Sequence, residues 1–241
     1  MNCVILQPSY IPWRGYFDLI QRADVFVFYD DVQYDKHGWR NRNRVKTAGG
    51  TKWLTIPVRS GGNVVEGTPI RAIEIDSTQN WARKHWETIR QSYAKAPYFG
   101  RYRSMVEEFY AATPPLLADF TIETTVALAR ALGIEHTRFV RSSDLPATGA
   151  KTDRLVDLLT HLGATHYISG PSARDYMEDA KLAAAGITLE YIVYEYPEYP
   201  QLYPPFAPQV SVIDLLLMTG PDAPRFVWDR AAVAPAEDRR P

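Results

Sequence analysis

A repeated pattern of helix, glycine and strand in the second half of the chain constrains the fold most. Apolar residues recur at helical spacing, a glycine follows, and a short apolar run comes next. Glycine just past a helix is a typical C-terminal cap, and helices that alternate with buried strands are typical of a parallel sheet. The pattern predicts three such units, at 122–140, 152–169 and 171–194, with Gly133, Gly163 and Gly186 after their helices.

The start of the chain adds a unit of the same kind. Met1–Leu6 is a short apolar run, two prolines break it, 13–23 has apolar residues at helical spacing, and Val25–Tyr29 is a second apolar run. We therefore expect an α/β fold with a mostly parallel, Rossmann-like, doubly wound sheet. Ligands of such sheets bind at the carboxyl ends of the strands, so 7–14 and 30–43 should lie side by side at one rim.

Between these regions the sequence predicts an added antiparallel hairpin and a helical insertion. Trp53–Val58 and Ile70–Ile75 have strand-like apolar patterns on either side of the turn residues 60–63. Apolar residues at helical spacing then predict helices over 82–93 and 101–112. His85 falls off the apolar stripe of the first of these helices and is expected on its surface.

The length of 241 residues suits a single α/β domain over 1–225. Pro114–Pro115 is the best internal break and separates two halves, about 1–112 and 116–225. The segment 229–241 is rich in Ala, Pro and charged residues and is expected to be a flexible tail.

Overall composition excludes several classes of protein. A formal net charge of −1 provides no basic field for nucleic acid as the main partner. The single cysteine, Cys3, excludes an internal disulfide and a cysteine-cluster metal site. No apolar run reaches the roughly 20 residues of a membrane-spanning helix, and no signal-like segment opens the chain, so we expect a cytoplasmic protein.

The turn after the first strand resembles a nucleotide-binding turn. In Pro12-Trp13-Arg14-Gly15-Tyr16, the last four residues have the spacing of the His-x-Gly-His part of the Pro-x-His-x-Gly-His turn of nucleotidyltransferases that share this first unit. In those enzymes the glycine lets the nucleotide approach the backbone and the histidines contact phosphate. Here Trp13 and Tyr16 stand in the histidine positions, so the resemblance concerns the architecture and not the catalytic signature. Signatures of P-loop kinases, zincins and α/β-hydrolases are absent from the sequence.

A set of motifs spread over most of the chain carries a family resemblance. The motifs are Gln7-Pro8-x-Tyr10-x-Pro12-Trp13-x-Gly15-Tyr16-Phe17, Ala23-Asp24-Val25-Phe26-Val27, Asp30-Asp31-Val32-Gln33, Asn41-Arg42-Asn43, Lys151-Thr152-Asp153-Arg154-Leu155, Gly163-Ala164-Thr165-x-Tyr167-x-Ser169-Gly170 and Tyr199-Pro200-Gln201. With these motifs the chain resembles the WbqC-like family over about Cys3 to Gly220. Some members have a histidine just before the opening glutamine, where this chain has Leu6, so a role for that histidine does not carry over. The usual setting of the family, gene clusters for O-antigen and related glycoconjugates, implies sugar-linked biosynthesis.

A basic loop after the second strand is the first candidate site. Residues 35–50 contain five Lys or Arg and one acid. Such a loop suits phosphate, pyrophosphate or carboxylate, because arginine can bind these groups through two bonds. A solvated charge run is the alternative, but the alternation of Asn41 and Asn43 with arginine favours binding. Asp30 and Asp31 are candidates for a general base or for a magnesium ligand, and a structural role is the alternative. The residues expected to be catalytic are Asp30, Asp31 and Lys36.

The second half offers three further candidate positions. Ser169–Arg174 runs from a strand end into a helix start, where free N–H groups and two serine hydroxyls could bind an anion or simply cap the helix. Residues 151–154 begin the preceding helix, and Thr152 is its expected cap. The side chains of Lys151 and Asp153 are then free to bind a substrate. The segment 194–205, rich in tyrosine and proline, either lines a sugar or base pocket or only covers the sheet.

The leading hypothesis is a transferase that transfers or activates an acyl or aminoacyl group. Its substrate would be small and anionic, for example a nucleotide-linked amino sugar, in glycoconjugate or specialised-metabolite biosynthesis. The alternatives are a nucleotidyltransferase or adenylating enzyme with a degraded turn, and a non-catalytic binding subunit with biosynthetic enzymes as partners. No cofactor or metal ligand set follows from the sequence. The expected substrate-binding residues are Gln7, Tyr10, Trp13, Tyr16, Trp39, Arg40, Asn41, Arg42, Asn43, Lys151, Asp153, Ser169, Ser172 and Gln201.

Overall fold

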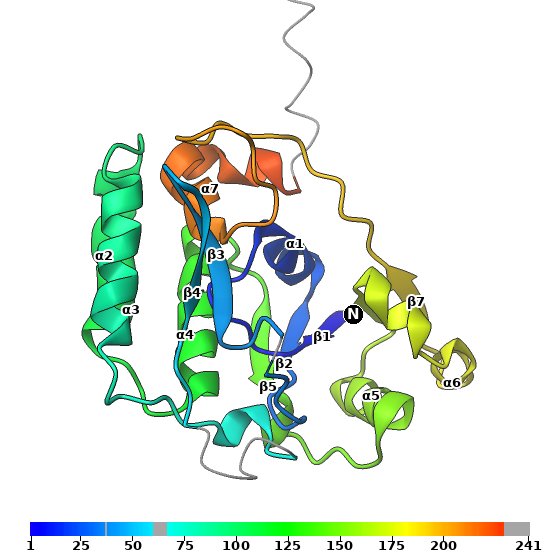
Figure 1. Ribbon diagram of the computed structural model, residues 1–241. Coiled ribbons are helices and arrows are strands. Elements are labelled where there is room, and N and C mark those ends of the chain that lie inside the picture. The colour runs from blue at the N-terminus through cyan, green and yellow to red at the C-terminus, as the bar shows by residue number, and fades with distance from the viewer. Residues whose placement is uncertain (37, 60–66, 229–241) are drawn as a thin grey trace, which may run out of the picture.

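A parallel sheet forms the centre of the fold (Figure 1). In the computed structural model, which describes residues 1–36, 38–59 and 67–228, five strands make up this sheet in the order β5-β2-β1-β6-β7. Cys3 of the central strand lies opposite Val25 on one side and Tyr167 on the other. The strands are β1 (Asn2–Leu6), β2 (Val25–Phe28), β5 (Arg138–Arg141), β6 (His166–Ser169) and β7 (Thr188–Tyr191).

Helices cover both faces of this sheet, as expected for a doubly wound fold. Because successive side chains of a strand point to opposite faces, Val4 and Phe26 pack with α1 and α4, whereas Cys3 and Val25 pack with α5 and α6. Each large side chain buried in this way contributes about 1.5–3 kcal/mol. The helices are α1 (Arg14–Arg22), α4 (Leu117–Ala131), α5 (Lys151–Leu162) and α6 (Asp179–Ala184). The expected Rossmann-like fold class is confirmed.

The strand order changes direction beside β1. From β1 the chain moves through α1 to β2 and then to β5 on one side, and later returns to β6 and β7 on the other side. The connections on the two sides lie on opposite faces, so the segments that leave β1 and β6 diverge at the carboxyl ends of these strands. A crevice is expected at this point of any doubly wound sheet.

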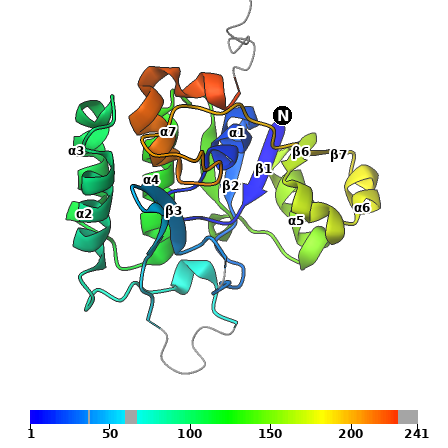
Figure 2. The ribbon, with the colours of Figure 1, turned by 45° about the horizontal axis from the view of Figure 1, so that its top comes forward.

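The antiparallel hairpin is present but comes earlier in the chain than the sequence indicates. It pairs β3 (Arg42–Thr47) with β4 (Gly50–Thr55) and stands apart from the parallel sheet, between that sheet and the α2–α3 pair (Figures 1 and 2). The expected pairing of Trp53–Val58 with Ile70–Ile75 is wrong, since only Val58 and Ile75 form an isolated bridge. In β3, the partly exposed Arg42 and Arg44 alternate with the buried Asn43 and Val45. This alternation is typical of a strand, so the basic segment is not the loop that the sequence indicated.

The helical insertion is confirmed and builds one side of the molecule. Helices α2 (Trp81–Tyr93) and α3 (Phe99–Ala111) lie side by side at the edge away from α5 and α6 (Figures 1 and 2). Trp86 stacks on Phe99 with ring centroids 6.4 Å apart. His85, expected on the surface, is only 7% exposed and hydrogen-bonds the Tyr10 hydroxyl at 2.9 Å.

The helix–glycine–strand units of the second half are largely as expected. Gly163, with φ of 69°, follows α5 in the left-handed conformation that a glycine cap requires. The third unit differs, because the segment after β6 is a short 3-10 helix (Pro171–Asp175) that ends before α6. Thr152 is not a cap: its buried hydroxyl accepts the N–H of Glu178 at 3.2 Å, at the start of α6.

The last described helix, α7 (Val212–Thr219), begins at the expected cap, since Ser211 Oγ accepts the N–H of Ile213. Further 3-10 turns lie at Ile70–Ala72, Ser142–Asp144 and Gly220–Phe226. No helix in the described part of the chain is long and apolar enough to cross a membrane. The expected turn at 60–63 and the expected flexible tail at 229–241 lie outside the described residues.

Candidate functional site

A cavity of about 940 Å³ opens where β1 and β6 end. Gln7 follows β1 and Ser169 ends β6, and both line the cavity. These strands are the neighbours between which the order of the sheet changes direction, so the cavity lies where ligands of doubly wound sheets bind. The segment from α1, the hairpin and the Tyr/Pro-rich segment after β7 supply the remaining walls.

The turn that leaves β1 is held in a strained conformation. Ile11 has a φ of 34°, which a β-branched residue rarely adopts and which costs on the order of 1–3 kcal/mol. The buried Asn43 side chain donates to the carbonyls of Tyr10 and Ile11 at 3.0 and 2.9 Å. The N–H of Val212 also donates to the carbonyl of Pro12 at 2.8 Å. The turn is thus fixed by the hairpin on one side and by α7 on the other.

Trp13 covers the glycine of this turn. A Cβ atom at Gly15 would overlap the Trp13 indole, so only glycine leaves room for the ring. The indole packs edge-on against Tyr194 and Tyr196, with centroids 5.0 and 5.9 Å away. In the resembling nucleotidyltransferase turn the nucleotide approaches the backbone over this glycine, whereas here the chain's own indole fills that space. Trp13 therefore serves as a wall of the cavity.

Arg40 provides a positive charge on one wall. Its Nη1 donates to Gln7 Oε1 at 2.7 Å, and its buried Nε has no hydrogen-bond partner. Burial lowers the pKa of the Arg40 guanidinium from its ordinary value, but an arginine stays charged at neutral pH. The Tyr16 hydroxyl donates to the Gln7 carbonyl at 3.1 Å, and burial raises the pKa of this phenol. Gln7 is thereby positioned by both neighbours.

Another wall comes from the second half of the chain. Lys151, the first residue of α5, has a φ of 52° and lines the cavity together with Ser169 and Ser172. The Tyr194 hydroxyl lies against Gly170, where an added Cβ would be 3.2 Å from it. Burial raises the pKa of Tyr194 to about 12, so this phenol stays protonated at neutral pH. Lysine and hydroxyl groups thus line the same cavity as Arg40.

The lining is cationic and aromatic. Its described residues include three cations, Arg14, Arg40 and Lys151, and no Asp, Glu or His. The Arg14 guanidinium is committed to the carbonyls of Pro197 and Phe226, at 2.7 and 3.1 Å, and so has a structural role. Arg40 and Lys151 remain as the cations that can meet a ligand. Anions are favoured in such a cavity, since the described lining residues include cations and no carboxylate.

Comparison with known proteins agrees with the motifs of the sequence. The model of the WbqC-like protein family matches residues 7–226. This chain belongs to the WbqC-like protein family. It is 39% identical over 225 residues to "Uncharacterized protein Rv1507c" of Mycobacterium tuberculosis (strain ATCC 25618 / H37Rv), which covers 92% of this chain and 96% of that protein. No solved structure matches the chain.

The part matched by the WbqC-like family contains nearly the whole cavity. Of the described lining residues, only Ile5 and Leu6 precede the match, which begins at Gln7. Nine residues expected to bind substrate in this WbqC-like chain meet at the cavity, although they come from opposite halves of the sequence. They are Gln7, Trp13, Tyr16, Trp39, Arg40, Asn43, Lys151, Ser169 and Ser172.

The aspartates expected to be catalytic lie in a structural network beside the cavity lining. Asp30 is fully buried and accepts from the backbone N–H and the hydroxyl of Ser143, at 3.1 and 3.0 Å. Asp31 is bound by the Arg154 guanidinium and by the Ser142 hydroxyl. These bonds join the end of β2 to the turn after β5 and to α5. In this WbqC-like protein the pair connects elements of the sheet rather than facing the cavity.

Other expected site residues of the WbqC-like chain also bind within the protein. The buried Tyr10 hydroxyl contacts His85 Nδ1 at 2.9 Å and the Tyr110 hydroxyl at 2.6 Å. Asn41 is buried and donates to the Ile56 carbonyl at 2.8 Å. These side chains support the walls from behind and are not part of the lining.

Four more expected residues lie outside the lining. Gln201 donates to Asp214 of α7 at 2.8 Å and so anchors the Tyr/Pro-rich segment. Asp153 forms an ion pair with Lys181 of α6 at 2.8 Å. Arg42 lies on the hairpin with its guanidinium over the Trp53 ring, and Lys36 is exposed.

The expected anion site at a helix start after β6 is not formed as predicted. Pro171–Asp175 is a five-residue 3-10 helix, which is too short for a strong helix dipole. Ser169 is buried and its hydroxyl lies 3.4 Å from the Tyr167 hydroxyl. The serines of this segment line the cavity as hydroxyl groups, without a helix end behind them.

Sequence reasoning did not single out several lining residues. Tyr29 directly follows β2, and its position at a strand end could have indicated it. Tyr194 and Tyr196 belong to a segment noted only for its composition, and their spacing of two puts both on the side that faces Trp13. Tyr176, 67% exposed, gives no signal in the sequence. In the described part of the chain, no group of three or more His, Cys, Asp or Glu could hold a metal ion.

Proposed function

We propose that this WbqC-like protein is a transferase that transfers or activates an acyl or aminoacyl group on a small anionic or nucleotide-linked amino-sugar substrate. Such a reaction belongs to glycoconjugate or specialised-metabolite biosynthesis. The observation that carries the proposal is the cavity at the carboxyl ends of β1 and β6, which Arg40 and Lys151 both line and which has no carboxylate among its described lining residues.

Arg40 is the group proposed to bind the anion. Gln7 accepts from one of its N–H donors, and the buried Nε of Arg40 has no hydrogen-bond partner among the described residues. A guanidinium has five donors in a planar fork, so phosphate or carboxylate can occupy the others. Each charge-assisted hydrogen bond of this kind contributes about 1.5–3 kcal/mol. An anionic group at Arg40 would therefore account for much of the affinity of a small substrate.

The size of the cavity supports a reaction between two substrates. A volume of about 940 Å³ is near the upper end of the roughly 300–1,000 Å³ that is usual for ligand pockets. A donor and an acceptor can therefore be bound at the same time, which is what group transfer requires. The aromatic walls formed by Trp13, Tyr194 and Tyr196 would exclude water from the reacting groups.

The chemistry of the lining favours a substrate that brings its own nucleophile. No Asp, Glu or His among the described lining residues is placed to act as a general base. The amine of an amino sugar needs no such base to attack. In the proposed step a bond forms between the amine nitrogen and the acyl carbon, and the bond from that carbon to the leaving group breaks. The amine proton passes to the leaving group or to water, and Lys151 stabilises the negative charge that develops on the acyl oxygen.

Adenylation or nucleotidyl transfer is the second candidate, because Arg40 and Lys151 would also stabilise the departure of pyrophosphate. Two observations weaken it: Trp13 and Tyr16 replace the histidines of the resembling turn, and the Trp13 indole fills the space over Gly15. The third candidate is a binding subunit that uses the same cavity without turnover.

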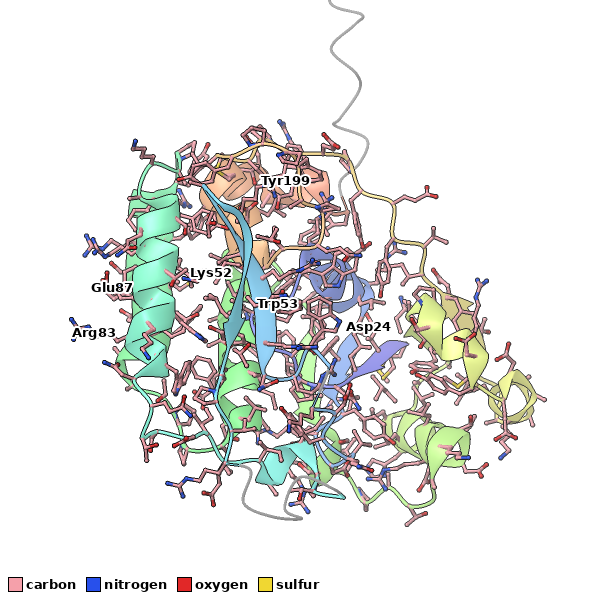
Figure 3. The ribbon with its side chains drawn as sticks, in the orientation of Figure 1. Asp24, Lys52, Trp53, Arg83, Glu87 and Tyr199 are labelled. Atoms are coloured by element: carbon pink, nitrogen blue, oxygen red, sulfur yellow. The ribbon has the colours of Figure 1, made fainter. Side chains whose placement is uncertain are left out.

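Ligand-induced stabilisation tests the proposal. The melting temperature is measured with a nucleotide-linked amino sugar, coenzyme A, ATP and CTP, each with and without magnesium. A ligand that binds only the folded state raises the melting temperature with concentration. The Arg40→Met variant should weaken the binding of the active ligand by about 10- to 100-fold, the loss expected for one charge-assisted bond. The matched control is Arg83→Met, because Arg83 is exposed on the outer side of α2 (Figure 3).

Two results would contradict the proposed site. One is a folded protein that none of these ligands stabilises, and the other is a ligand that binds Arg40→Met as well as the wild type. Mass spectrometry of the mixture of donor and acceptor then distinguishes the three candidates. An acylated sugar supports acyl transfer, release of pyrophosphate supports adenylation, and binding with unchanged substrates supports a binding subunit.

A further inference from the structure

Two exposed tryptophans lie together at the mouth of the cavity. Trp39 is 41% exposed and Trp53 is 45% exposed, although large aromatic side chains are usually well buried. Their ring centroids are 5.3 Å apart and their planes are inclined by 32°, so the rings are in contact in a tilted arrangement. We call these two residues the tryptophan pair.

The tryptophan pair is continuous with the cavity. Trp39 lines it and directly precedes Arg40 in the chain. Trp53 lies on β4 opposite Arg44 of β3. The Arg44 guanidinium lies 5.7 Å from the Trp39 centroid and 5.3 Å from the Trp53 centroid, and it also donates to the side chain of Gln209, a lining residue, at 3.0 Å.

Two arginines of β3 lie against the tryptophan pair. The guanidinium groups of Arg42 and Arg44 lie 4.9 and 5.3 Å from the Trp53 centroid. The Arg44 guanidinium packs against both rings and adds a positive charge to the surface of the tryptophan pair. The combination of exposed planar rings and adjacent guanidinium groups suits a ligand that has a flat ring at one end and negative charge at the other.

A simple packing role explains the tryptophan pair less well. Cross-strand side-chain pairs do stabilise hairpins, and Arg44 and Trp53 form such a pair, with the guanidinium over the ring. However, Trp39 is not on either strand, and packing alone does not require two rings with more than 40% of their surface exposed beside a cavity. Exposed aromatic surface next to a cavity is typical of a binding site.

We propose that Trp39, supported by Trp53, binds the base of a nucleoside diphosphate whose phosphates are bound by Arg40. This inference rests on the proposed function, because it places the anionic part of the substrate at Arg40. Every base has a flat π face, so stacking on an aromatic side chain needs no base-specific hydrogen bond. The group attached to the diphosphate would then extend toward Lys151.

Comparison of uridine diphosphate with inorganic pyrophosphate measures the contribution of the nucleoside, and variants of Trp39 separate the base from the ribose. Isothermal titration calorimetry of the full chain should show that uridine diphosphate and adenosine diphosphate bind at least about tenfold more tightly than pyrophosphate. In Trp39→Ala this advantage should disappear while the affinity for pyrophosphate stays unchanged. Trp39→Phe should restore most of it, because phenylalanine keeps a ring for stacking. Stacking should also quench tryptophan fluorescence with the diphosphates but not with pyrophosphate.

The matched control is Lys52→Gln. Lys52 adjoins Trp53 on β4 but faces α2, where its amine lies 3.5 Å from the Thr88 hydroxyl (Figure 3). The variant removes one positive charge from the hairpin and should bind all three probes like the wild type.

The outcomes separate this inference from the proposed function. If the wild type binds uridine diphosphate and pyrophosphate equally, or if Trp39→Ala retains the advantage of the diphosphates, the base is not bound by Trp39. The anion site at Arg40 would still stand in either case, provided that Arg40→Met weakens both probes. If no probe binds, or if Arg40→Met binds them normally, the proposed function fails together with the inference.

Discussion

At the scale of single residues, the buried His85 shows how a polar side chain supports the cavity without lining it. Its Nδ1 contacts the hydroxyl of Tyr10, which also contacts Tyr110 of α3. Burial lowers the pKa of His85 from 6.5 to about 4, so the imidazole is neutral in the folded protein at neutral pH. Tyr10 belongs to the turn after β1, so this chain of bonds links the turn to the helical insertion.

Stability should therefore fall in mildly acidic solution. The folded-state pKa of His85 lies below its ordinary value, so the unfolded chain binds the additional proton as the pH drops from about 6.5 to about 4. Between pH 7 and pH 5 this residue alone should lower the free energy of unfolding by about 2 kcal/mol. Urea denaturation at a series of pH values measures the effect.

A variant isolates the contribution of His85 to this pH dependence. His85→Gln replaces the imidazole by a polar side chain that does not titrate. The variant should be less stable than the wild type at pH 7, because the contact of His85 with Tyr10 is lost. Its free energy of unfolding should fall less than that of the wild type as the pH is lowered. His161→Gln, at an exposed position of α5, is the matched control and should retain the wild-type dependence. An unchanged pH dependence in His85→Gln would contradict the assignment.

Several residues could not be assigned from the sequence because their partners are distant in the chain. Tyr10 and His85 are 75 positions apart, and Tyr10 and Tyr110 are 100 apart. The spacing of α2 suggested that His85 points outward, yet the neighbouring hairpin and turn cover that side. By contrast, Gln7 and Lys151 could be placed at the rim from local sequence, because Gln7 follows a strand and Lys151 begins a helix.

At the scale of elements, the turn from β1 into α1 is fixed by packing rather than by its own preferences. Ile11 is held at a positive φ by the two bonds from Asn43, and Trp13 is folded back over Gly15. Both features position the wall of the cavity that carries Trp13. A small change in this turn should therefore affect ligand binding more than it affects stability.

Replacement of Gly15 by alanine tests this view. The new Cβ would overlap the Trp13 indole and displace it from Tyr194 and Tyr196. Such overpacking typically costs about 1–3 kcal/mol, and ligand affinity should fall although the protein still folds. The melting temperature and calorimetric affinity measure the two effects.

Gly100→Ala is the matched control for this substitution. Gly100 lies in α3 and an added Cβ there has nothing within 4 Å. Because alanine is the better helix former by roughly 1 kcal/mol, this variant should be as stable as the wild type or more stable, with unchanged binding. Equal behaviour of the two variants would argue against a special role for Gly15.

The hairpin shows where element prediction failed. The segment Arg42–Thr47 was expected to be a basic loop, because its charges dominate its composition. Its alternation is the stronger signal: Asn43 and Val45 are buried while Arg42 and Arg44 lie at the surface. The strand formers at 53–58 were correctly expected to be extended, but their partner precedes them in the chain instead of following them.

At the scale of the whole molecule, the sheet order decides where the cavity lies, and this could be predicted. Repeated helix–glycine–strand units indicated a doubly wound sheet, and the rim beside β1 was expected to hold the site. The sequence could not reveal that β6 pairs with β1, which brings Lys151 and Ser169 next to Gln7. Such pairing depends on contacts between residues more than 100 positions apart, for which local pattern gives no information.

A buried aspartate joins the distant parts of this architecture. Asp214 of α7 accepts hydrogen bonds from Tyr93 of α2 at 2.8 Å, from Tyr199 at 2.7 Å and from Gln201 at 2.8 Å. Burial raises the pKa of its carboxyl group. Tyr199 and Gln201 belong to the segment that continues from the wall residues Tyr194 and Tyr196, so Asp214 anchors one side of the cavity.

Asp214→Ala should lower the free energy of unfolding by about 3–5 kcal/mol, because three buried donors lose their acceptor. Urea denaturation measures the loss. Asp222→Ala is the matched control: Asp222 is exposed and lies 3.5 Å from Arg225, and such a surface pair is worth no more than about 1 kcal/mol. Similar losses in the two variants would contradict the structural role of Asp214.

The walls of the cavity have a consequence for the order in which the protein matures during translation. Gln7, Trp13 and Arg40 leave the ribosome early, whereas Tyr194, Tyr196 and Gln209 leave it near the end of synthesis. A nascent chain that has not yet reached residue 194 therefore lacks four described lining residues, Tyr194, Tyr196, Pro208 and Gln209. Its early segments must remain soluble without help from substrate, and the ligand can act as a stabiliser only after the last wall has docked on α7.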